Sequence, residues 1–231
     1  MKTSSWEDAQ KNELAVWQHT VNNISDLLDE IAETAILVRF GTQHGLGTSA
    51  NVVELGIGPL GIGWSAFAPT ARAVGVDPLA RLTVNTTDDS VDRFFKELQM
   101  RTEFLQADAT ARLPLDDSSF DLIVCENVVD HTQDPQAILA EGRRLVRPDG
   151  RLLFGVNVFS TIGFMKWRHV TRRLHPRHPN VLCHPHSFLE NHLGRLLANA
   201  GWQTLAIDAP GGVMHRVAGH SYRVRAIARP N

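Results

Sequence analysis

The glycine-rich stretch 52–63, VVELGIGPLGIG, has the residue types and spacing of a loop that binds a nucleotide-like cofactor. An apolar run containing one acid is followed by Gly56, Gly58 and Gly61. Glycine adopts backbone angles that other residues avoid and lets a ligand approach closely. A helix predicted to begin near Ile62 would add the positive end of its dipole. The G-x-G-x-x-G spacing is shared by several cofactor classes, so other residues must identify the cofactor.

Two acids follow the next two predicted strands. Asp77 ends the strand at 72–76, and Asp108 follows the strand at 102–106. An acid in the position of Asp77 can accept hydrogen bonds from ribose hydroxyls, which NAD and S-adenosylmethionine both carry. Asp108, with the backbone N–H groups beside it, has the chemistry to read an adenine edge. The two acids indicate a nucleoside but do not choose between these cofactors.

Glu54 and Pro59 favour S-adenosylmethionine over a dinucleotide. The carboxylate of Glu54 lies two residues before the first glycine, where it would attract a sulfonium or amino group and repel two phosphates. Pro59 removes one backbone N–H from the loop. That loss weakens a pyrophosphate cradle and matters less for a ligand without phosphates.

Two histidines are candidates for chemistry at the acceptor. If the cofactor is S-adenosylmethionine, the reaction is transfer of its methyl group to an acceptor, an in-line displacement in which the protein mainly positions the two reactants. A hydroxyl acceptor also benefits from a base, and histidine suits that task near neutral pH. His131 follows the strand at 120–125, at the edge of the sheet where ligands bind. A structural role is the alternative for His131, and His186 is a second candidate in the acceptor pocket.

Histidines are dense between His169 and His192. A metal site could draw on His175, His178, Cys183, His184 and His186. None of these spacings matches a helical H-x-x-x-H pair or a zinc ribbon. The sequence therefore predicts no metal.

Bulk properties exclude several classes of protein. With 231 residues and 43% hydrophobic content, the chain predicts one α/β domain with a large core. A formal net charge of −2 argues against a general polyanion binder, including a nucleic-acid binder. Two distant cysteines predict a reducing compartment rather than a disulfide framework. No signal pattern or run of ~18 apolar residues is present, so we expect a cytoplasmic protein with no membrane span. A monomer or a homodimer fits equally well.

Apolar runs alternate with helical patterns along the chain, which predicts a parallel sheet covered on both faces. An amino-terminal helical stripe is expected to break at 20–23, and 40–49 is expected to be a linker. A capping box at 187–190 predicts a helix to about residue 200, followed by a hairpin-like antiparallel return. The predicted strands are 51–55, 72–76, 102–106, 120–125, 151–158, 202–208 and 221–228, with further helices at 90–100 and 135–146.

Five motifs in order over about residues 51–205 resemble the class I S-adenosylmethionine-dependent methyltransferases of the small-molecule type. They are VVELGIGPLG, AVGVDP, QADATARLPLDDSSFDLIVCENVVDHTQDP, ILAEGRRLVRPDGRLLFGVN and HPHSFLENHLGRLLANAGW. The resemblance implies a Rossmann-like, seven-stranded, mostly parallel sheet of order 3-2-1-4-5-7-6. Strand seven would be antiparallel and helices would cover both faces. Residues 1–231 would form a single methyltransferase domain.

The resemblance also implies S-adenosylmethionine as cofactor and a set of residues that bind it. Glycine-loop contacts, ribose and adenine contacts, and contacts to the methionine portion would come from Glu54, Gly56, Gly58, Asp77, Pro78, Asp108, Ala109, Glu126 and Asn127. Each has a simpler alternative: a turn glycine, a turn acid, a solvated acid or a local cap. The chain departs from the family at Leu60, where a glycine is common and Gly61 comes one residue late.

Two segments are predicted to cover the site, the helical residues 1–40, whose apolar stripe could also pack on the core, and an insertion at 159–186. The insertion contains no acid and is rich in Lys, Arg and aromatic residues. It predicts a small-molecule acceptor bearing a carboxylate or a phosphate. In the alternative interpretation the basic insertion pairs with residues 1–40, which hold seven acids against three Lys or Arg. The basic residues of the insertion are Lys166, Arg168, Arg172, Arg173 and Arg177.

Two other functions remain open. A catalytically silent protein of the same fold, which binds the cofactor or a partner, would keep every motif. An NAD-dependent oxidoreductase fits the glycines and Asp77 but not Glu54 or Pro59. The acceptor and its attacking atom do not follow from the fold, because O-, N- and C-methylation share it.

Overall fold

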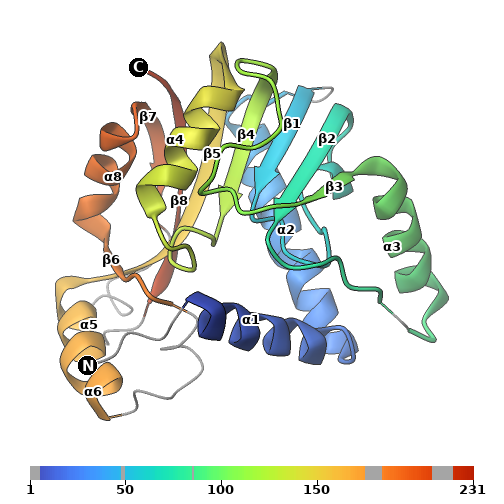
Figure 1. The fold of residues 1–231 in the computed structure, drawn as a ribbon, viewed down its shortest axis with the longest axis horizontal. Helices are drawn as coiled ribbons and strands as arrows, with labels where there is room; N and C mark the ends of the chain where they lie inside the picture. Colours follow the sequence, from blue (N-terminus) through green and yellow to red (C-terminus); the bar gives the residue numbers. More distant parts are fainter. Residues whose placement is uncertain (1–5, 48–49, 85, 175–183, 210–220) are drawn as a thin grey trace.

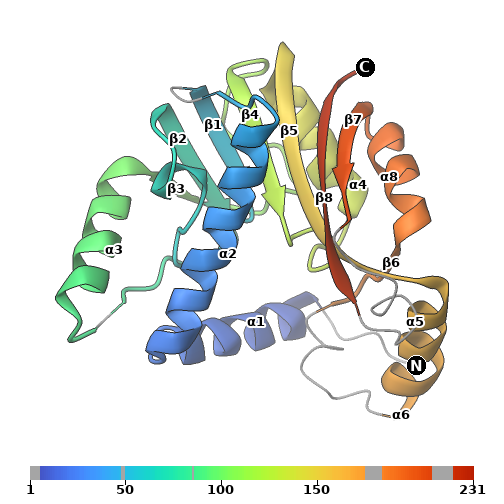
Figure 2. The same cartoon turned by 180° about the vertical axis from the view of Figure 1, so that it is seen from behind.

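The computed structural model describes residues 6–47, 50–84, 86–174, 184–209 and 221–231. A central sheet runs through the molecule with helices on both faces (Figure 1, Figure 2). Its strands follow the order β3-β2-β1-β4-β5-β8-β7. The strands are β1 (Ala50–Leu55), β2 (Thr70–Asp77), β3 (Glu103–Gln106), β4 (Phe120–Glu126), β5 (Val146–Phe159), β7 (Trp202–Asp208) and β8 (Tyr222–Pro230).

The pairing confirms the predicted strand order. β1 to β5 are mutually parallel where they pair, and β8 runs antiparallel to both β5 and β7. β8 is therefore the antiparallel seventh strand of the predicted order, and β7 is the sixth. A short additional strand, β6 (Phe188–Leu189), pairs with the end of β5.

Helices bury both faces of the sheet, which explains why the central strands are almost wholly apolar. On one face, α4 (Pro135–Leu145) and α8 (Leu193–Asn199) pack Ile138 and Leu197 into the core with Trp202. Asp134 caps α4 by accepting from the backbone N–H groups of residues 136 and 137. α3 (Asp89–Arg101) packs near the β3 edge of the sheet (Figure 1).

The other face is covered by α2 (Ile24–Gln43), which packs Leu37 and Val38 against Val52 and Leu122. α1 (Trp6–Thr20) precedes it and lies across one end of the sheet (Figure 1). The predicted break between these helices is confirmed, with Asn23 as the N-cap of α2. The predicted linker at 40–49 is wrong for its first residues, since α2 continues through Gln43.

The helix predicted near Ile62 is absent. The chain makes only a three-residue 3-10 turn, η1 (Trp64–Ala66), before β2 begins. Trp64 is buried under α2, so close to Gly41 that a Cβ there would lie 2.7 Å from the indole ring. The face that a following helix would cover is therefore occupied by α2 and this tryptophan. The glycine loop has no helix dipole behind it.

The predicted capping box at 187–190 is also wrong. Ser187 precedes β6, and a 3-10 turn, η3 (Glu190–His192), separates β6 from α8. The carboxylate of Glu190 accepts a hydrogen bond from the hydroxyl of Tyr222 on β8 rather than capping a helix. Glu190, which the sequence pattern assigned to a local cap, instead makes a contact between two distant segments of the chain.

The insertion after β5 is helical from Thr161 to Leu174. It consists of α5 (Thr161–Lys166), a π-helical turn η2 (Trp167–Thr171) and α6 (Arg172–Leu174). The Trp167 ring stacks on Phe159 at 5.5 Å, and its Nε1 donates to Ser187 Oγ at 3.0 Å. Residues 175–183 of the predicted insertion, including Arg177 and Cys183, lie outside the described residues. No helix in the described part of the chain is long and apolar enough to cross a membrane.

Candidate functional site

A cavity of about 210 Å³ lies at the carboxyl edge of the parallel strands, and we call it the glycine-loop cavity. Its wall includes every residue predicted to bind the cofactor, namely Glu54, Gly56, Gly58, Asp77, Pro78, Asp108, Ala109, Glu126 and Asn127. His131 lines it as well. Residues from four consecutive parallel strands and the turns after them therefore meet in one place, as the topology of the sheet requires.

Packing and backbone angle both require glycine at the start of the loop. Gly56 has φ +77°, and a Cβ there would lie 2.4 Å from the Val128 side chain. The backbone N–H groups of Gly56 and Ile57 both donate to Val76 O, at 2.7 and 3.1 Å. Gly58 also has a positive φ, +76°. The loop is thereby held against the end of β2.

Asp77 ties the glycine loop to its own strand end. Its Oδ2 accepts from Gly58 N and its Oδ1 from Leu79 N, both at 2.9 Å. Burial raises the pKa of Asp77 to about 6, although these two donors favour the charged form. Each carboxylate oxygen has a second lone pair, so the side chain retains acceptor capacity toward the cavity. Asp108 is held similarly, with Oδ1 accepting from the N–H and the hydroxyl of Thr110 at 2.8 and 2.7 Å.

Glu54 is buried at the base of the cavity, where its Oε2 accepts from Trp64 N at 2.9 Å. Burial raises the pKa of Glu54 to about 7, and the nearby charge of Glu126 adds to the rise. Gly63 leaves the room for this carboxylate, because a Cβ there would lie 2.0 Å from Oε2. The acid sits poised to ionise when a cation enters.

Glu126 is held by two arginines that sequence reasoning missed. Its Oε1 pairs with Arg223 Nη1 at 2.7 Å and Arg225 Nε at 3.1 Å, both from β8. Arg225 also pairs with Glu33 of α2 at 3.2 Å. The second oxygen of Glu126 is buried without a hydrogen-bond partner among the described residues. These arginines could have been found from the antiparallel register, which sets β8 beside β5, but not from any motif.

Asn127 follows Glu126 in a strained conformation. Its φ is +57°, in the left-handed region that non-glycine residues seldom adopt. The backbone N–H donates to Gly155 O at 2.8 Å, and Oδ1 accepts from Asn157 Nδ2 at 3.0 Å. Strained backbone conformations are often found at functional sites, where contacts with the surrounding structure hold them in place.

The two amino-terminal helices supply a wall of the cavity that no motif identified. Trp17 Nε1 donates to Glu13 Oε1 at 3.1 Å, and the Trp17 ring lies against Gly58, with 3.2 Å to a Cβ placed there. The sequence indicated a cover at 1–40 but not which side chains face inward. The missed residues are Gln10, Glu13 and Trp17 of α1 and Glu30, Glu33, Thr34 and Leu37 of α2.

The lining of the cavity is strongly acidic. Two groups that carry positive charge, Arg223 and His131, face seven carboxylates. A negative cavity favours a cationic ligand and repels a pyrophosphate. The seven acids are Glu13, Glu30, Glu33, Glu54, Asp77, Asp108 and Glu126.

His131 is enclosed by carboxylates. Its Nδ1 lies 3.1 Å from Glu13 Oε2, and its Nε2 lies 3.9 Å from Asp130 Oδ1. Burial alone would lower the pKa of His131, but the charges of Asp130 and Glu13 outweigh it and raise the pKa to about 9. In this arrangement the ring keeps its proton at neutral pH. A ring in that state does not suit the predicted role of general base and fits the structural role that the sequence also allowed.

A second cavity of about 410 Å³, the insertion cavity, lies beside the first. His186 belongs to this cavity and not to the glycine-loop cavity, with its Nε2 3.3 Å from Gln133 O. The two predicted catalytic histidines thus line different cavities. The lining residues of the insertion cavity are Asp130, Asn157, Phe159, Lys166, Trp167, Thr171, His184, His186, Ser187 and Ser221.

Residues 53–154 match a protein family described as "Methyltransferase domain". The matched range begins in β1 and ends in β5, so it includes most of the glycine-loop cavity. The amino-terminal helices, the insertion and β8 fall outside it.

Two curated proteins are similar to this chain in sequence, and one solved structure is similar to it in fold. An uncharacterized 37.1 kDa protein in transposon TN4556 of Streptomyces fradiae is 29% identical over 160 residues, covering 66% of this chain and 43% of that protein. The human thiol S-methyltransferase TMT1B is 30% identical over 136 residues, or 54% of each chain. The chain spans about half or less of the length of the curated relatives it matches.

Among solved structures, Burkholderia thailandensis 1,6-didemethyltoxoflavin-N1-methyltransferase superposes with a TM-score of 0.64. The sequences are 18% identical, and the alignment covers 100% of this chain and 92% of the other. That enzyme was solved with 1,6-didemethyltoxoflavin and S-adenosylhomocysteine bound. At this identity the likeness establishes the fold.

Proposed function

Because this chain belongs to the class I S-adenosylmethionine-dependent methyltransferases, as its sequence predicted, we propose that it transfers the methyl group of S-adenosylmethionine to a small-molecule acceptor. The cofactor occupies the glycine-loop cavity, and the acceptor enters from the insertion cavity. Holding the two in line for displacement is the protein's main contribution and is worth ~7–11 kcal/mol.

The observation that carries this proposal is the charge of the glycine-loop cavity. Seven carboxylates line it. S-adenosylmethionine brings a sulfonium and an amino group, both positive, whereas NAD brings two phosphates. The absence of a helix after the glycine loop points the same way, because a pyrophosphate is usually held at a helix N-terminus.

The proposed contacts follow from the wall of the cavity. Asp77 accepts from the ribose hydroxyls while holding Gly58 in place. Ala109 is buried beside Asp108, and we assign this corner to the adenine. Glu54 and Glu126 remain for the charged methionine portion of the cofactor.

The proposed acceptor carries a carboxylate or a phosphate. Lys166 lines the insertion cavity beside the stacked rings of Phe159 and Trp167. The position of Lys166 on the wall of this cavity supports a basic insertion that serves the acceptor.

The attacking atom is the least constrained part of the proposal. Two mammalian relatives besides the human protein are also named thiol S-methyltransferases, so a thiol belongs in any acceptor screen. The screen should pair thiols with carboxylate- and phosphate-bearing phenols and amines of similar size.

Ligand-induced stabilisation tests the cofactor assignment. At about 100 times its Kd, S-adenosylhomocysteine adds ~2.7 kcal/mol to the free energy of unfolding. We expect a rise in Tm of several degrees with S-adenosylhomocysteine and none with NAD. Stabilisation by NAD alone would contradict the proposal.

A turnover assay separates an enzyme from a silent binding protein of the same fold. S-adenosylhomocysteine should accumulate only when an acceptor is present. If the cofactor binds but no acceptor in a broad screen causes its consumption, the silent alternative is favoured instead.

A further inference from the structure

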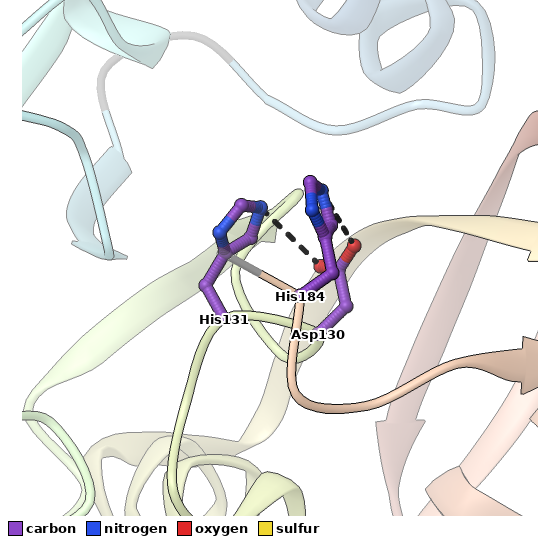
Figure 3. Close-up of side chains that lie close together, drawn as sticks. All are labelled: Asp130, His131 and His184. Carbon is purple, nitrogen blue, oxygen red and sulfur yellow. Dashed lines mark ion pairs between the residues drawn. The ribbon is translucent and has the colours of Figure 1, made fainter. Parts of the chain in front are cut away.

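Three side chains meet where the glycine-loop cavity borders the insertion cavity. Asp130 and His131 come from the turn after β4, and His184 comes from the segment before β6 (Figure 3). One potential ligand atom from each residue lies within 4.8 Å of the others. This cluster unites a residue of the first cavity, His131, with two residues of the second.

We propose that Asp130, His131 and His184 form a binding site for a divalent transition-metal ion of the Zn²⁺ type. Two imidazoles and one carboxylate form a ligand set that Zn²⁺ uses when it keeps one position open. Imidazole nitrogen also distinguishes such a site from the all-oxygen sites of Mg²⁺ and Ca²⁺.

The spacing of the three groups matches a coordination shell better than a hydrogen-bond network. His131 Nε2 lies 3.9 Å from Asp130 Oδ1, and His184 Nε2 lies 3.7 Å from Asp130 Oδ2. Both distances are too long for hydrogen bonds. The two distances reach different oxygens of Asp130, and one potential ligand atom from each residue lies within 4.8 Å of the others. Ligand atoms ~2.0–2.1 Å from a tetrahedral zinc are about 3.3–3.4 Å apart, so side-chain rotations must draw the three atoms together when the ion binds.

The buried carboxylate supplies an independent observation. Asp130 is only 2% exposed, and its Oδ1 has no hydrogen-bond partner among the described residues. Leaving a buried carboxylate oxygen unsatisfied is costly, and a bound cation removes that cost. Oδ1 is the same oxygen that faces His131.

The far side of His131 has the partner that a metal-bound histidine usually has. Its Nδ1 lies 3.1 Å from Glu13 Oε2, while Nε2 faces the cluster. A carboxylate at the second ring nitrogen fixes the orientation of the imidazole and strengthens it as a ligand. Glu13 is itself held by Trp17 Nε1, so α1 would orient the ligand from outside the metal shell.

Spacing rules could not reveal this site, because its members come from two distant segments. In the sequence, the spacing of His184 from His175, His178, Cys183 and His186 matches no known metal-site pattern. The structure instead places His184 against the turn after β4, with ring centroids of His131 and His184 4.2 Å apart. Three protein ligands leave a fourth position, and Asp130 and His184 line the insertion cavity beside it.

Metal binding can be measured without any methyl donor, so the test does not depend on the proposed function. Purified protein is stripped with a chelator and titrated with Co²⁺ at about pH 8, where protons compete less with the metal for the imidazole nitrogens than they do at neutral pH. We expect one equivalent to bind with the strong visible absorption of a tetrahedral site, and Zn²⁺ to displace it. Absence of binding, or a weak octahedral spectrum, would overturn the proposal.

Substitutions then locate the ion. Asp130→Asn and His184→Gln should each weaken Co²⁺ binding at least tenfold, and Glu13→Gln about tenfold because it acts only through His131. His19→Gln replaces an exposed histidine of α1 and should change the affinity less than twofold. His184 is only partly buried, so its variant remains informative if Asp130→Asn fails to fold.

The double variant His175→Gln/His178→Gln tests for adventitious binding by neighbouring histidines. We expect it to retain one equivalent of Co²⁺ with the wild-type spectrum. Loss of binding in this variant, with retention in His184→Gln, would overturn the proposal. The affinity for S-adenosylhomocysteine, measured on the same samples, reports separately on the proposed function.

Discussion

The glycine-loop cavity and the insertion cavity share a border but are built from different parts of the chain. The first is walled by the ends of β1, β2 and β4, whose positions the sheet fixes, and by backbone groups hydrogen-bonded to Val76. The second is lined mainly by the insertion and by the segment around His184 and His186. The arrangement of strands in the sheet therefore determines the first cavity, whereas a segment inserted after β5 determines most of the second.

This difference has a chemical counterpart. The glycine-loop cavity is acidic, while Lys166 and two histidines give the insertion cavity a basic side. A cationic donor and an anionic acceptor would each find the complementary charge. Changes in one cavity should therefore affect one ligand and leave the other nearly unchanged.

The largest effect is expected at Gly56. Gly56→Ala places a Cβ 2.4 Å from Val128 at a φ of +77°, so we expect a loss of about 3 kcal/mol of stability and no detectable S-adenosylhomocysteine binding. Chemical denaturation and calorimetry measure the two quantities. Gly45 has φ +78° with nothing within 4 Å of an added Cβ.

Gly45→Ala is the matched control for backbone strain alone. It should cost ~1 kcal/mol and leave cofactor binding intact. Equal behaviour of the two variants would mean that the close approach at Gly56 has no special importance.

Asp77→Asn should weaken S-adenosylhomocysteine binding by about 10- to 150-fold. The estimate corresponds to the ~1.5–3 kcal/mol of a hydrogen bond to a charged group. Isothermal titration measures it, with the exposed, ion-paired Glu103→Gln as control. Acceptor KM should change little; a larger effect on the acceptor than on the cofactor would contradict the division between the cavities.

The affinity for S-adenosylhomocysteine should rise with pH because of Glu54. Its pKa of about 7 in the free protein means that much of it is protonated at pH 6, and a cationic amino group favours the ionised form. Affinity should therefore increase about tenfold between about pH 6 and 8 and then level off. Glu54→Gln should flatten the profile.

The same raised pKa has the opposite sign for folding. The free protein binds a proton at Glu54 more tightly when folded, so this group's contribution to stability falls as the pH rises from about 4.5 to about 7. Urea denaturation of wild type and Glu54→Gln across that range tests the sign. A wild-type stability that rises relative to the variant would show that Glu54 is not the titrating group.

The smallest effect is expected at the insertion. Lys166→Gln should raise acceptor KM by about three- to tenfold and leave S-adenosylhomocysteine affinity unchanged, because one partly solvated charge is lost. Charge reversal at Arg172 and Arg173 should act in the same direction. Lys96→Gln, on α3 and paired with Asp92, is the control. If Lys166→Gln and the charge reversals at Arg172 and Arg173 all leave the acceptor kinetics unchanged, the insertion does not bind the acceptor through these charges.

The sheet and much of the wall of the glycine-loop cavity could be predicted because both follow from local patterns. Buried strands end in acids and glycines, and parallel topology brings those ends together, so the meeting of Glu54, Asp77 and Asp108 in one cavity could be predicted from the sequence. His131 was also placed correctly at the edge of the sheet. The contact between His131 and Glu13 could not be predicted, since Glu13 comes from a helix more than a hundred positions earlier in the chain.

The errors arise where a distant contact replaces a local preference. The helix expected near Ile62 gives way to α2 and the buried Trp64, and the expected capping box gives way to a bond from Tyr222 to Glu190. Arg223 and Arg225 reach Glu126 only because β8 returns beside β5. No spacing within a single segment contains this information.

The placement of α1 has a kinetic consequence. Glu13 and Trp17 cover the glycine-loop cavity and are tied to His131 and to each other. We expect release of a spent cofactor from this cavity to require outward movement of α1 and separation of the Glu13–His131 pair. The residence time of the nucleoside would then depend on a segment that lies outside the matched range 53–154.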